Sequence, residues 1–447
     1  MKILVYTIPP IYSNKIHGGA QNILIELMRG LSKFGHEIHV ICGKYENDTP
    51  PFQIFEKVWV YPLLNVNPSC DEDLTLEQII ENIRTIQKLI EKIDVIVSID
   101  RAFPIFTTKP ILLMLSTLSY YFSIKALFSL NYNKVIVPSR YLYNCTKYIL
   151  YGTDENTHEF CKVIPNGLNH IFYRPTGELH PVFNKYENSI KILFPHRADP
   201  RKGFKKAIDF LSYIKEQYNV YMFVPKQDFF IDNIKFYNEL LIYAKKLGVK
   251  DRIILHKWIP LEEVPTYFSS GDVVFNLSTL AEGFGLVVYE SILCGTPVIS
   301  TKCGALRDVT NELKGVWWID HDYTMGDLIF AFENAINNKG AAHQGRELII
   351  TKHSIESMIK GYLNEIEKLI SEPRLKLYQV KNMELLPRTT KIVIPPWCYI
   401  TKKGNLYNDI TGQVYPLKNK EKDVITTCQK MGTKFLSDKD NLREVIK

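Results

Sequence analysis

Short apolar runs alternate with amphipathic segments along most of this chain. The first run, Lys2–Tyr6, is followed after a loop by apolar positions at helical spacing between Ala20 and Leu31. The later runs of this first series span Glu37–Cys42, Asp94–Ile99, Ile111–Leu115 and Lys134–Val137. Strands that alternate with helices form parallel sheets covered on both faces. The pattern therefore predicts a Rossmann-like α/β domain, which we assign to residues 1–184.

A second series of the same kind starts after a polar, turn-forming stretch at Pro181–Ser189. Amphipathic segments separate its runs, for example between Ala207 and Ile214. The expected strands span Lys191–Phe194, Asn219–Val224, Arg252–His256, Asp272–Asn276, Pro297–Thr301 and Val316–Ile319. This series predicts a second Rossmann-like domain at residues 185–352.

The end of the chain differs from both series. An apolar stripe from Ile355 to Ile370, with Ser354 as N-cap and Pro373 as stop signal, predicts a long helix at residues 353–374. Beyond it, short β-like pieces alternate with Pro, Gly and Asn turns. These pieces span Lys391–Ile394, Cys398–Thr401, Leu406–Tyr407 and Gln413–Tyr415. Residues 375–447 are therefore expected to form an appendage that contains a small meander.

Charge changes this picture only at the C-terminus. The 447 residues include 55 basic and 48 acidic side chains, a formal net charge of +7. Fourteen basic and seven acidic residues lie between residues 375 and 447, so the rest of the chain is neutral. A neutral body offers no basic field, and we expect no nucleic-acid partner. The basic appendage favours contact with a partner or an anionic membrane, with a merely solubilising extension as the alternative.

Neither a membrane span nor a disulfide framework is indicated. The most apolar stretch, Ile111–Leu130, is interrupted by polar residues, whereas a spanning helix needs about 20 apolar residues. The first residues lack the apolar segment of a signal peptide. The 8 cysteines include no C-x-x-C pair, so we expect free thiols and no zinc site. These features favour a cytoplasmic protein.

Glycine-rich loops after strands carry the candidate chemistry. Neither G-x-G-x-x-G nor G-x-x-x-x-G-K-[ST] occurs, which disfavours a dehydrogenase or a P-loop protein. Instead, Ala281–Glu290 links an expected strand to an expected helix, with Gly283 and Gly285 at the turn. Such a turn presents N–H groups at the positive end of a helix, where a phosphate or a sugar hydroxyl binds. Glu282 and Glu290 would reach opposite ends of one elongated ligand, although such a pair alone is usually solvated.

Two further loops have the same position between a strand and a helix. In His196–Gly203, Arg197 and Lys202 are placed to clamp a diphosphate, with a solvated basic loop as the alternative. In the first domain, Gly18 and Gly19 precede the first helix and would approach the same ligand. A plain loop explains this glycine pair equally well.

At these residues the sequence resembles family 4 of the glycosyltransferases. Glu282 and Glu290 match the E-x7-E motif of that family, in the expected E-G-F-G-L context. Arg197 and Lys202 match its G-R-x-x-P-x-K-G pattern, although His196 replaces the first Gly. Val163-Ile-Pro-Asn-Gly167, with Phe172-Tyr-Arg-Pro175, resembles the V-I-P-N-G segment that enters the second domain, and Gly18-Gly19-Ala20 resembles the N-terminal Gly-Gly loop.

The resemblance implies the GT-B fold, in which two Rossmann-like domains face each other and a C-terminal helix, here residues 353–374, packs back on the first. It implies a hexosyltransferase-like enzyme that moves a sugar from a nucleoside diphosphate donor to an acceptor hydroxyl. Retention at the anomeric carbon is implied, with no metal and no cofactor. The acceptor would be a glycan, a lipid-linked molecule or a protein, bound by the first domain, while the second binds the donor.

The resemblance also implies a role for each matching residue. Arg197 and Lys202 would hold the diphosphate, Glu282 the hydroxyls of the donor sugar, and Glu290 the ribose. The catalytic set is thus Glu282, Arg197 and Lys202. The remaining donor-binding positions are Gly18, Gly19, Gly283, Phe284, Gly285 and Leu286, the last three through their amides.

One departure from the family concerns the acceptor side. After Pro110 the family commonly has a strand that ends in His, whereas here the strand runs into Ser116. Ser116 is therefore the acceptor-side candidate. The missing His leaves a second interpretation open, a catalytically silent GT-B subunit that binds nucleotide-sugar or scaffolds a partner enzyme. A nucleotide-sugar epimerase of the same fold is a third, weaker interpretation.

Overall fold

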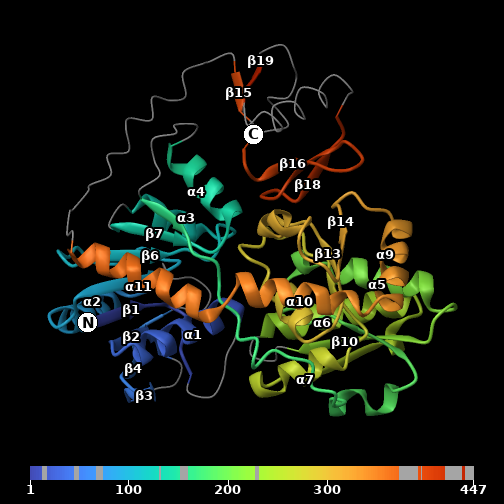
Figure 1. The fold of residues 1–447 in the computed structure, drawn as a ribbon, viewed down its shortest axis with the longest axis horizontal. Coiled ribbons are helices and arrows are strands. Elements are labelled where there is room, and N and C mark those ends of the chain that lie inside the picture. Colours follow the sequence, from blue (N-terminus) through green and yellow to red (C-terminus); the bar gives the residue numbers. More distant parts are fainter. Residues whose placement is uncertain are drawn as a thin grey trace. The chain divides into compact units, whose positions relative to one another are not determined.

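The chain folds into two compact α/β units, drawn as a ribbon in Figure 1. The computed structural model describes residues 1–12, 18–44, 50–66, 74–129, 132–151, 160–226, 231–371, 391–393, 395–417 and 435–437. The first unit comprises Met1–Gly167 and His353–Pro387, and the second Leu168–Lys352 and Arg388–Lys447. The division thus falls after Gly167, earlier in the chain than the boundary expected after residue 184.

The first unit is built on an eight-stranded sheet with the order β3-β4-β2-β1-β5-β6-β7-β8. Its strands are β1 (Lys2–Tyr6), β2 (Glu37–Gly43), β3 (Phe52–Phe55), β4 (Val58–Leu64), β5 (Val95–Ile99), β6 (Ile111–Met114), β7 (Lys134–Val137) and β8 (Cys161–Val163). The edge pair β3 and β4 is antiparallel, and the other pairings are parallel, as the alternating pattern predicted. Strands β3, β4 and β8 were not expected from the sequence.

The helices of the first unit include the predicted C-terminal helix. They are α1 (Gly19–Lys33), α2 (Leu76–Ile90), α3 (Tyr121–Phe128), α4 (Arg140–Tyr151) and α11 (Ile355–Ser371). Helix α11 begins after Ser354, whose hydroxyl accepts a hydrogen bond from the Ser357 amide at 3.1 Å. It packs on α1, where Gly30 lets the two helices approach: a Cβ at Gly30 would lie 1.9 Å from the Ile359 side chain.

The second unit contains a parallel six-stranded sheet with the order β11-β10-β9-β12-β13-β14. All six predicted strands are present, as β9 (Ile190–Leu193), β10 (Val220–Lys226), β11 (Ile253–Lys257), β12 (Val273–Asn276), β13 (Val298–Thr301) and β14 (Val316–Ile319). The α-helices are α5 (Phe204–Ile214), α6 (Ile231–Lys246), α7 (Val264–Ser269), α8 (Leu286–Leu293), α9 (Met325–Asn337) and α10 (Ala341–Lys352). The 3₁₀ turns that matter for the site are η2 (Pro200–Lys202) and η5 (Gly304–Val309).

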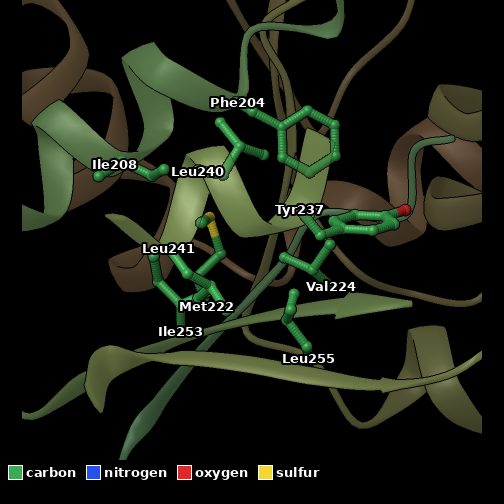
Figure 2. Close-up of a pocket in the computed structure, with 9 residues that line it drawn as sticks. All are labelled: Phe204, Ile208, Met222, Val224, Tyr237, Leu240, Leu241, Ile253 and Leu255. Carbon is green, nitrogen blue, oxygen red and sulfur yellow. The ribbon is translucent and has the colours of Figure 1, made fainter. Parts of the chain in front are cut away.

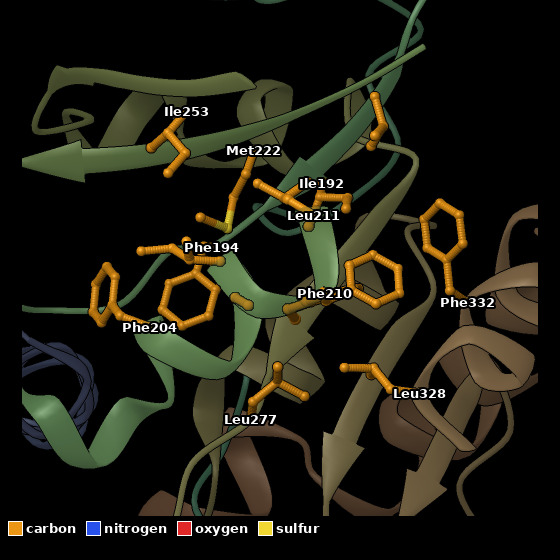
Figure 3. Close-up of a cluster of buried hydrophobic side chains, with 14 of the residues drawn as sticks. Ile192, Phe194, Phe204, Phe210, Leu211, Met222, Ile253, Leu277, Leu328 and Phe332 are labelled. Carbon is orange, nitrogen blue, oxygen red and sulfur yellow. The ribbon is translucent and has the colours of Figure 1, made fainter. Parts of the chain in front are cut away.

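Both faces of this second sheet are buried. Ile192 belongs to a cluster that includes α5, α6 and α9, whereas its neighbour Leu193 belongs to a cluster that includes α7, α8 and α10. Successive side chains of a strand point to opposite faces, so one apolar strand supplies both cores. Figure 3 shows the first cluster, in which Phe210 and Phe332 have their ring centroids 5.1 Å apart. Because both faces are covered, the loops that follow the carboxyl ends of the parallel strands remain accessible, and the candidate site lies there.

The end of the chain forms the meander that the sequence predicted. Strands β16 (Cys398–Ile400), β17 (Leu406–Asn408) and β18 (Gln413–Tyr415) pair antiparallel in that order. Two further short strands, β15 (Lys391–Val393) and β19 (Phe435–Ser437), pair with each other. The meander belongs to the second unit. Of the appendage expected at residues 375–447, residues 395–417 are the longest described stretch.

A small cavity between α5, α6 and strands β10 and β11 is entirely apolar (Figure 2). Its volume is about 10 Å³, and its lining includes Phe204, Met222 and Leu240. That is space for about one water molecule and offers no polar group to hold it. The cavity is therefore a packing defect of the core.

Among the described residues, no helix is both long enough and apolar enough to cross a membrane.

Candidate functional site

Two of the predicted site loops meet at an ion pair between Lys202 and Glu282. Lys202 ends the turn η2 after β9, and Glu282 lies in the loop between β12 and α8. The Lys202 ammonium donates a hydrogen bond to Glu282 Oε1 at 2.5 Å, although the residues are 80 positions apart in sequence. The two side chains are only 11% and 19% exposed. The structure thus brings together the cation and the carboxylate that the sequence assigned to one site.

The charges of this pair are set by its surroundings. Burial alone would raise the pKa of Glu282, but the charge and hydrogen bond of Lys202 outweigh it and hold the pKa below its usual value. Burial and the nearby Lys202 charge lower the pKa of His196 to about 4. His196 is therefore neutral at pH 7, and its Nε2 donates to the Phe275 carbonyl at 2.8 Å. The site holds an ionised carboxylate, a cation and a neutral imidazole.

Arg197 adds a second cation to the same loop. Its side chain is 46% exposed, and its guanidinium lies 3.4 Å from Asp199. Asp199 also accepts two hydrogen bonds from the Arg201 guanidinium, at 3.0 and 2.8 Å, and one from the Arg201 amide. Asp199 therefore fixes the shape of the basic loop. Asp199 was given no role from the sequence, although an Asp directly before Pro is a usual sign of such a turn.

Glycines at two positions allow the close approach of these loops. Gly203 has φ of 86°, and a Cβ there would lie 2.4 Å from the Leu277 carbonyl oxygen. Gly285 has φ of 90°, and a Cβ there would lie 2.5 Å from the Leu306 side chain. Both conformations are in the left-handed region that favours glycine. Helix α8 begins at Leu286, and the N–H groups of its first turn have no helical carbonyl to bind.

Glu290 occupies the buried face of α8. Its burial raises its pKa to about 7, against a hydrogen bond from the Tyr173 hydroxyl. Its carboxyl group therefore changes protonation near neutral pH. Tyr173 was given no role from the sequence, because it lies far from Glu290 in the chain.

In the first unit, the loop after β6 is joined to the end of β5. Ser116 donates from its amide to Asp100 Oδ1 at 2.6 Å, and its hydroxyl donates to Asp100 Oδ2. Asp100 has φ of 53°, unusual for a residue other than glycine, and burial raises its pKa to about 6. The acceptor-side candidate is therefore one half of a partly buried pair. The sequence analysis did not identify Asp100.

The glycine pair of the first unit lies at the start of α1. Gly18 is extended, with φ of 167°, and its carbonyl accepts the Asn22 amide at 3.1 Å. Gly19 is the first residue of the helix. These glycines shape a helix start, and His17 lies outside the described residues.

No metal centre is apparent in the part of the chain that the structure describes. Its residues contain no group of three or more His, Cys, Asp or Glu side chains able to hold a metal ion. The described cysteines are buried and form no disulfide bond with one another.

Comparison with known proteins is informative for the second unit. Residues 176–348 match the family model of the glycosyl transferases group 1. An uncharacterized glycosyltransferase of Methanocaldococcus jannaschii is 25% identical over 163 residues, which are 35% of this chain and 40% of that protein. A probable sucrose-phosphate synthase of Thermosipho melanesiensis is 24% identical over 210 residues, 46% of this chain and 47% of that protein. The chain thus spans less than half the length of these relatives.

Solved structures share the fold over most of the chain. Sucrose-phosphate synthase from Thermosynechococcus elongatus has a TM-score of 0.70 at 16% identity, over 83% of this chain and 99% of that one. HepE of Anabaena, in complex with UDP and glucose, has a TM-score of 0.62 at 17% identity, over 83% of this chain and 100% of that one. The two parallel-sheet units of this chain have the GT-B fold.

Proposed function

We propose that this chain, whose residues 176–348 match the family model of the group 1 glycosyltransferases, transfers a sugar from a nucleoside diphosphate donor to an acceptor hydroxyl with retention of configuration. One observation carries the proposal: the buried pair of Lys202 and Glu282 lies within this domain, at the loops that follow two parallel strands. Ligands of open parallel sheets bind at such loops.

Arg197 and Lys202 are the groups that would bind the diphosphate. Arg197 presents a half-exposed guanidinium, whose fork suits phosphate oxygens, and Lys202 supplies a compact charge beside it. The first turn of α8, from Leu286 onward, would add N–H groups of the helix start, with Phe284 and Gly285 before it. When the glycosidic bond breaks, negative charge develops on the diphosphate, and fixed cations and amides stabilise that charge.

Glu282 would bind hydroxyls of the donor sugar. Because its carboxylate is already ionised and held by Lys202, it accepts hydrogen bonds without a change of protonation. In the proposed step, the bond from the anomeric carbon to the diphosphate oxygen breaks and the acceptor oxygen bonds to the same face of that carbon. The acceptor proton passes to the departing phosphate oxygen. Neither Glu282 nor Glu290 need act as a nucleophile.

A uridine diphosphate sugar is the first donor to test. The HepE structures hold UDP with glucose and UDP-glucose, and they share the fold of this chain. The acceptor would be a glycan, a lipid-linked molecule or a protein, and the reaction as proposed uses neither a metal nor a cofactor. A peripheral contact with an anionic membrane belongs to the same proposal, through the basic residues of the C-terminal region.

The experiment that tests the function is a donor panel. The full chain is incubated with UDP-, GDP- and other nucleoside diphosphate sugars, and release of the nucleoside diphosphate is measured with and without added acceptors. Release of the nucleoside diphosphate with one donor supports the enzyme. Binding of nucleotide without release across all donors and acceptors supports the silent subunit, and a free epimerised sugar supports an epimerase.

A further inference from the structure

The meander of residues 395–417 reaches the loops that carry Lys202 and Glu282. We propose that its Asp409 is a positioning residue, which holds Glu282 in place for the sugar transfer proposed above, on which this inference rests. Asp409 follows β17 and lies far from the site in sequence, and neither the family resemblance nor the sequence pattern pointed to it.

The anchor is a buried pair between Asp409 and Arg307. Both guanidinium Nη atoms of Arg307 donate to the carboxylate of Asp409, at 2.9 and 2.6 Å. The Asp409 side chain is completely buried, and that of Arg307 is 16% exposed. A bidentate contact of this kind fixes the orientation of the two side chains as well as the distance between them. Arg307 lies in the turn η5, so Asp409 fixes the position of that turn.

The turn η5 is in direct contact with the backbone of Glu282. The Ala305 amide donates to the Glu282 carbonyl at 2.8 Å. Gly304 packs so closely that a Cβ on it would lie 2.3 Å from the same carbonyl oxygen, and its own amide lies 3.4 Å from Asp409 Oδ1. A displacement of η5 would therefore move the backbone that carries the Glu282 carboxylate.

A second connection joins the meander to both site loops. The Tyr407 hydroxyl donates to the Thr279 carbonyl at 3.3 Å, just before Glu282 in the chain. Thr279 in turn donates to the Arg201 carbonyl from its amide at 2.7 Å and from its hydroxyl at 3.2 Å. Arg201 is the neighbour of Lys202. The meander thus contacts the Glu282 loop directly and is connected to the Lys202 loop through Thr279.

The meander has anchors that do not depend on Asp409. The Lys402 amide donates to Asp320 at 2.7 Å, and the Thr401 hydroxyl donates to Asp322 at 2.6 Å. The His321 and Tyr407 rings stack with centroids 3.7 Å apart. We therefore expect the meander to stay docked when only the Asp409 charge is removed, which separates positioning from docking.

The test compares Asp409→Asn with Lys403→Ala. Asparagine keeps the shape of Asp409 but turns an N–H₂ group toward the Arg307 donors. Lys403 is the matched control, because it docks the same meander through the Asp322 carbonyl at 2.8 Å and the Asp327 carboxylate at 3.0 Å. Arg307→Lys keeps the positive charge but loses the pair of guanidinium donors that binds Asp409. It serves as the second variant if Asp409→Asn does not fold.

The first measurement is hydrogen exchange of the full chain without ligand, followed at the Ala305 amide and at residues 278–290. We expect exchange there to be faster by about tenfold or more in Asp409→Asn and Arg307→Lys, and unchanged in Lys403→Ala. The second measurement is kinetic, with the donor that the wild type turns over. We expect kcat to fall about tenfold or more in the first two variants while the Kd for free UDP stays within about twofold.

Wild-type exchange and wild-type kcat in both Asp409→Asn and Arg307→Lys would overturn the inference. An equal loss in Lys403→Ala would also overturn it, because the meander would then contribute docking alone. A wild-type chain that turns over no nucleoside diphosphate sugar defeats the proposed function. In that case the exchange data still decide whether Asp409 holds the Glu282 backbone.

Discussion

The candidate site residues of the two units differ in how they are supported. In the second unit, Lys202 and Glu282 form an ion pair, and backbone hydrogen bonds from Ala305 and Thr279 hold the loops around them. In the first unit, Ser116 is bound to one carboxylate, that of Asp100. The charged groups that would bind a donor are thus held from several sides, whereas the acceptor-side group forms a local pair.

The difference indicates which unit should be more sensitive to substitution. Charge that develops on a leaving diphosphate needs fixed groups around it, because reorganisation during the reaction is costly. An acceptor hydroxyl needs a neighbour that binds it and a path for its proton, and the leaving phosphate can take the proton. We therefore expect large effects from changes in the second unit and small ones from changes at Ser116.

The largest effect is expected for Glu282→Gln. The substitution removes the charge opposite Lys202 and alters the contact with the donor sugar, so turnover should fall about 10²–10³-fold, as for removal of other preorganised groups. Affinity for free UDP, which lacks the sugar, should change little. Steady-state kinetics and calorimetry on one preparation measure the two quantities. Glu347→Gln, on the exposed face of α10, is the control, and a loss of UDP affinity equal to the loss of turnover would contradict the assigned role.

Arg197→Ala and Lys202→Ala test the diphosphate contacts. Each should weaken UDP binding by about 1.5–3 kcal/mol, because a charge-assisted contact between two ionised groups is lost. Calorimetric titration with UDP measures the change. Arg201→Ala is the matched control in the same loop, since Arg201 pairs with Asp199 and has no assigned ligand. If Arg201→Ala weakened binding as much as Arg197→Ala, the loop would act through its net charge or its shape, and the direct contact assigned to Arg197 would be wrong.

The raised pKa of Glu290 predicts a dependence of donor binding on pH. Its pKa of about 7 means that the free protein carries the neutral acid below that pH and the carboxylate above it. Ribose hydroxyls donate more strongly to a carboxylate, so UDP affinity should rise with pH by about tenfold between pH 6 and pH 8. The second ionisation of a phosphate, near pH 6, adds its own dependence. In Glu290→Gln only the pH dependence that comes from the phosphate remains. Identical pH profiles of UDP affinity in the variant and the wild type would rule out ionisation of Glu290 as a cause of the wild-type dependence.

Much of the fold was predictable because it rests on local patterns. The six strands of the second sheet and the helix α11 follow from apolar runs, apolar stripes and a cap. The antiparallel pair β3 and β4 was missed: β4 includes Pro62, and a Pro within an apolar run weakens its strand pattern. Of the residues with a motif, Lys202 and Glu282 form an ion pair in the structure. Asp199, Asp100 and Tyr173 were given no role from the sequence.

The residues that were missed depend on partners distant in the chain or on local geometry. Asp409 and Arg307 are 102 positions apart, and no periodicity records which acid meets which base. The meander was predicted as strands, but its place on the second unit depends on side-chain contacts that only the folded chain displays. Asp100 is similar, because its left-handed backbone and its bond to Ser116 leave no sign in the composition of the segment.

The smallest effect is expected at Ser116, where the two units are compared most directly. Ser116→Ala removes the hydroxyl bond to Asp100 and keeps the amide bond, so the free energy of unfolding should fall by about 1 kcal/mol. Turnover should fall by about fivefold or less, since about 1 kcal/mol is the contribution expected of a single neutral hydroxyl. Chemical denaturation and steady-state kinetics measure the two changes, with Ser119→Ala as a control in the same loop. If turnover instead fell by about 10²-fold or more, the range of general acid–base help, the pair of Ser116 and Asp100 would handle the acceptor proton. The first unit would then contribute to the chemical step as directly as the second, and the expected difference in sensitivity between the two units would be wrong.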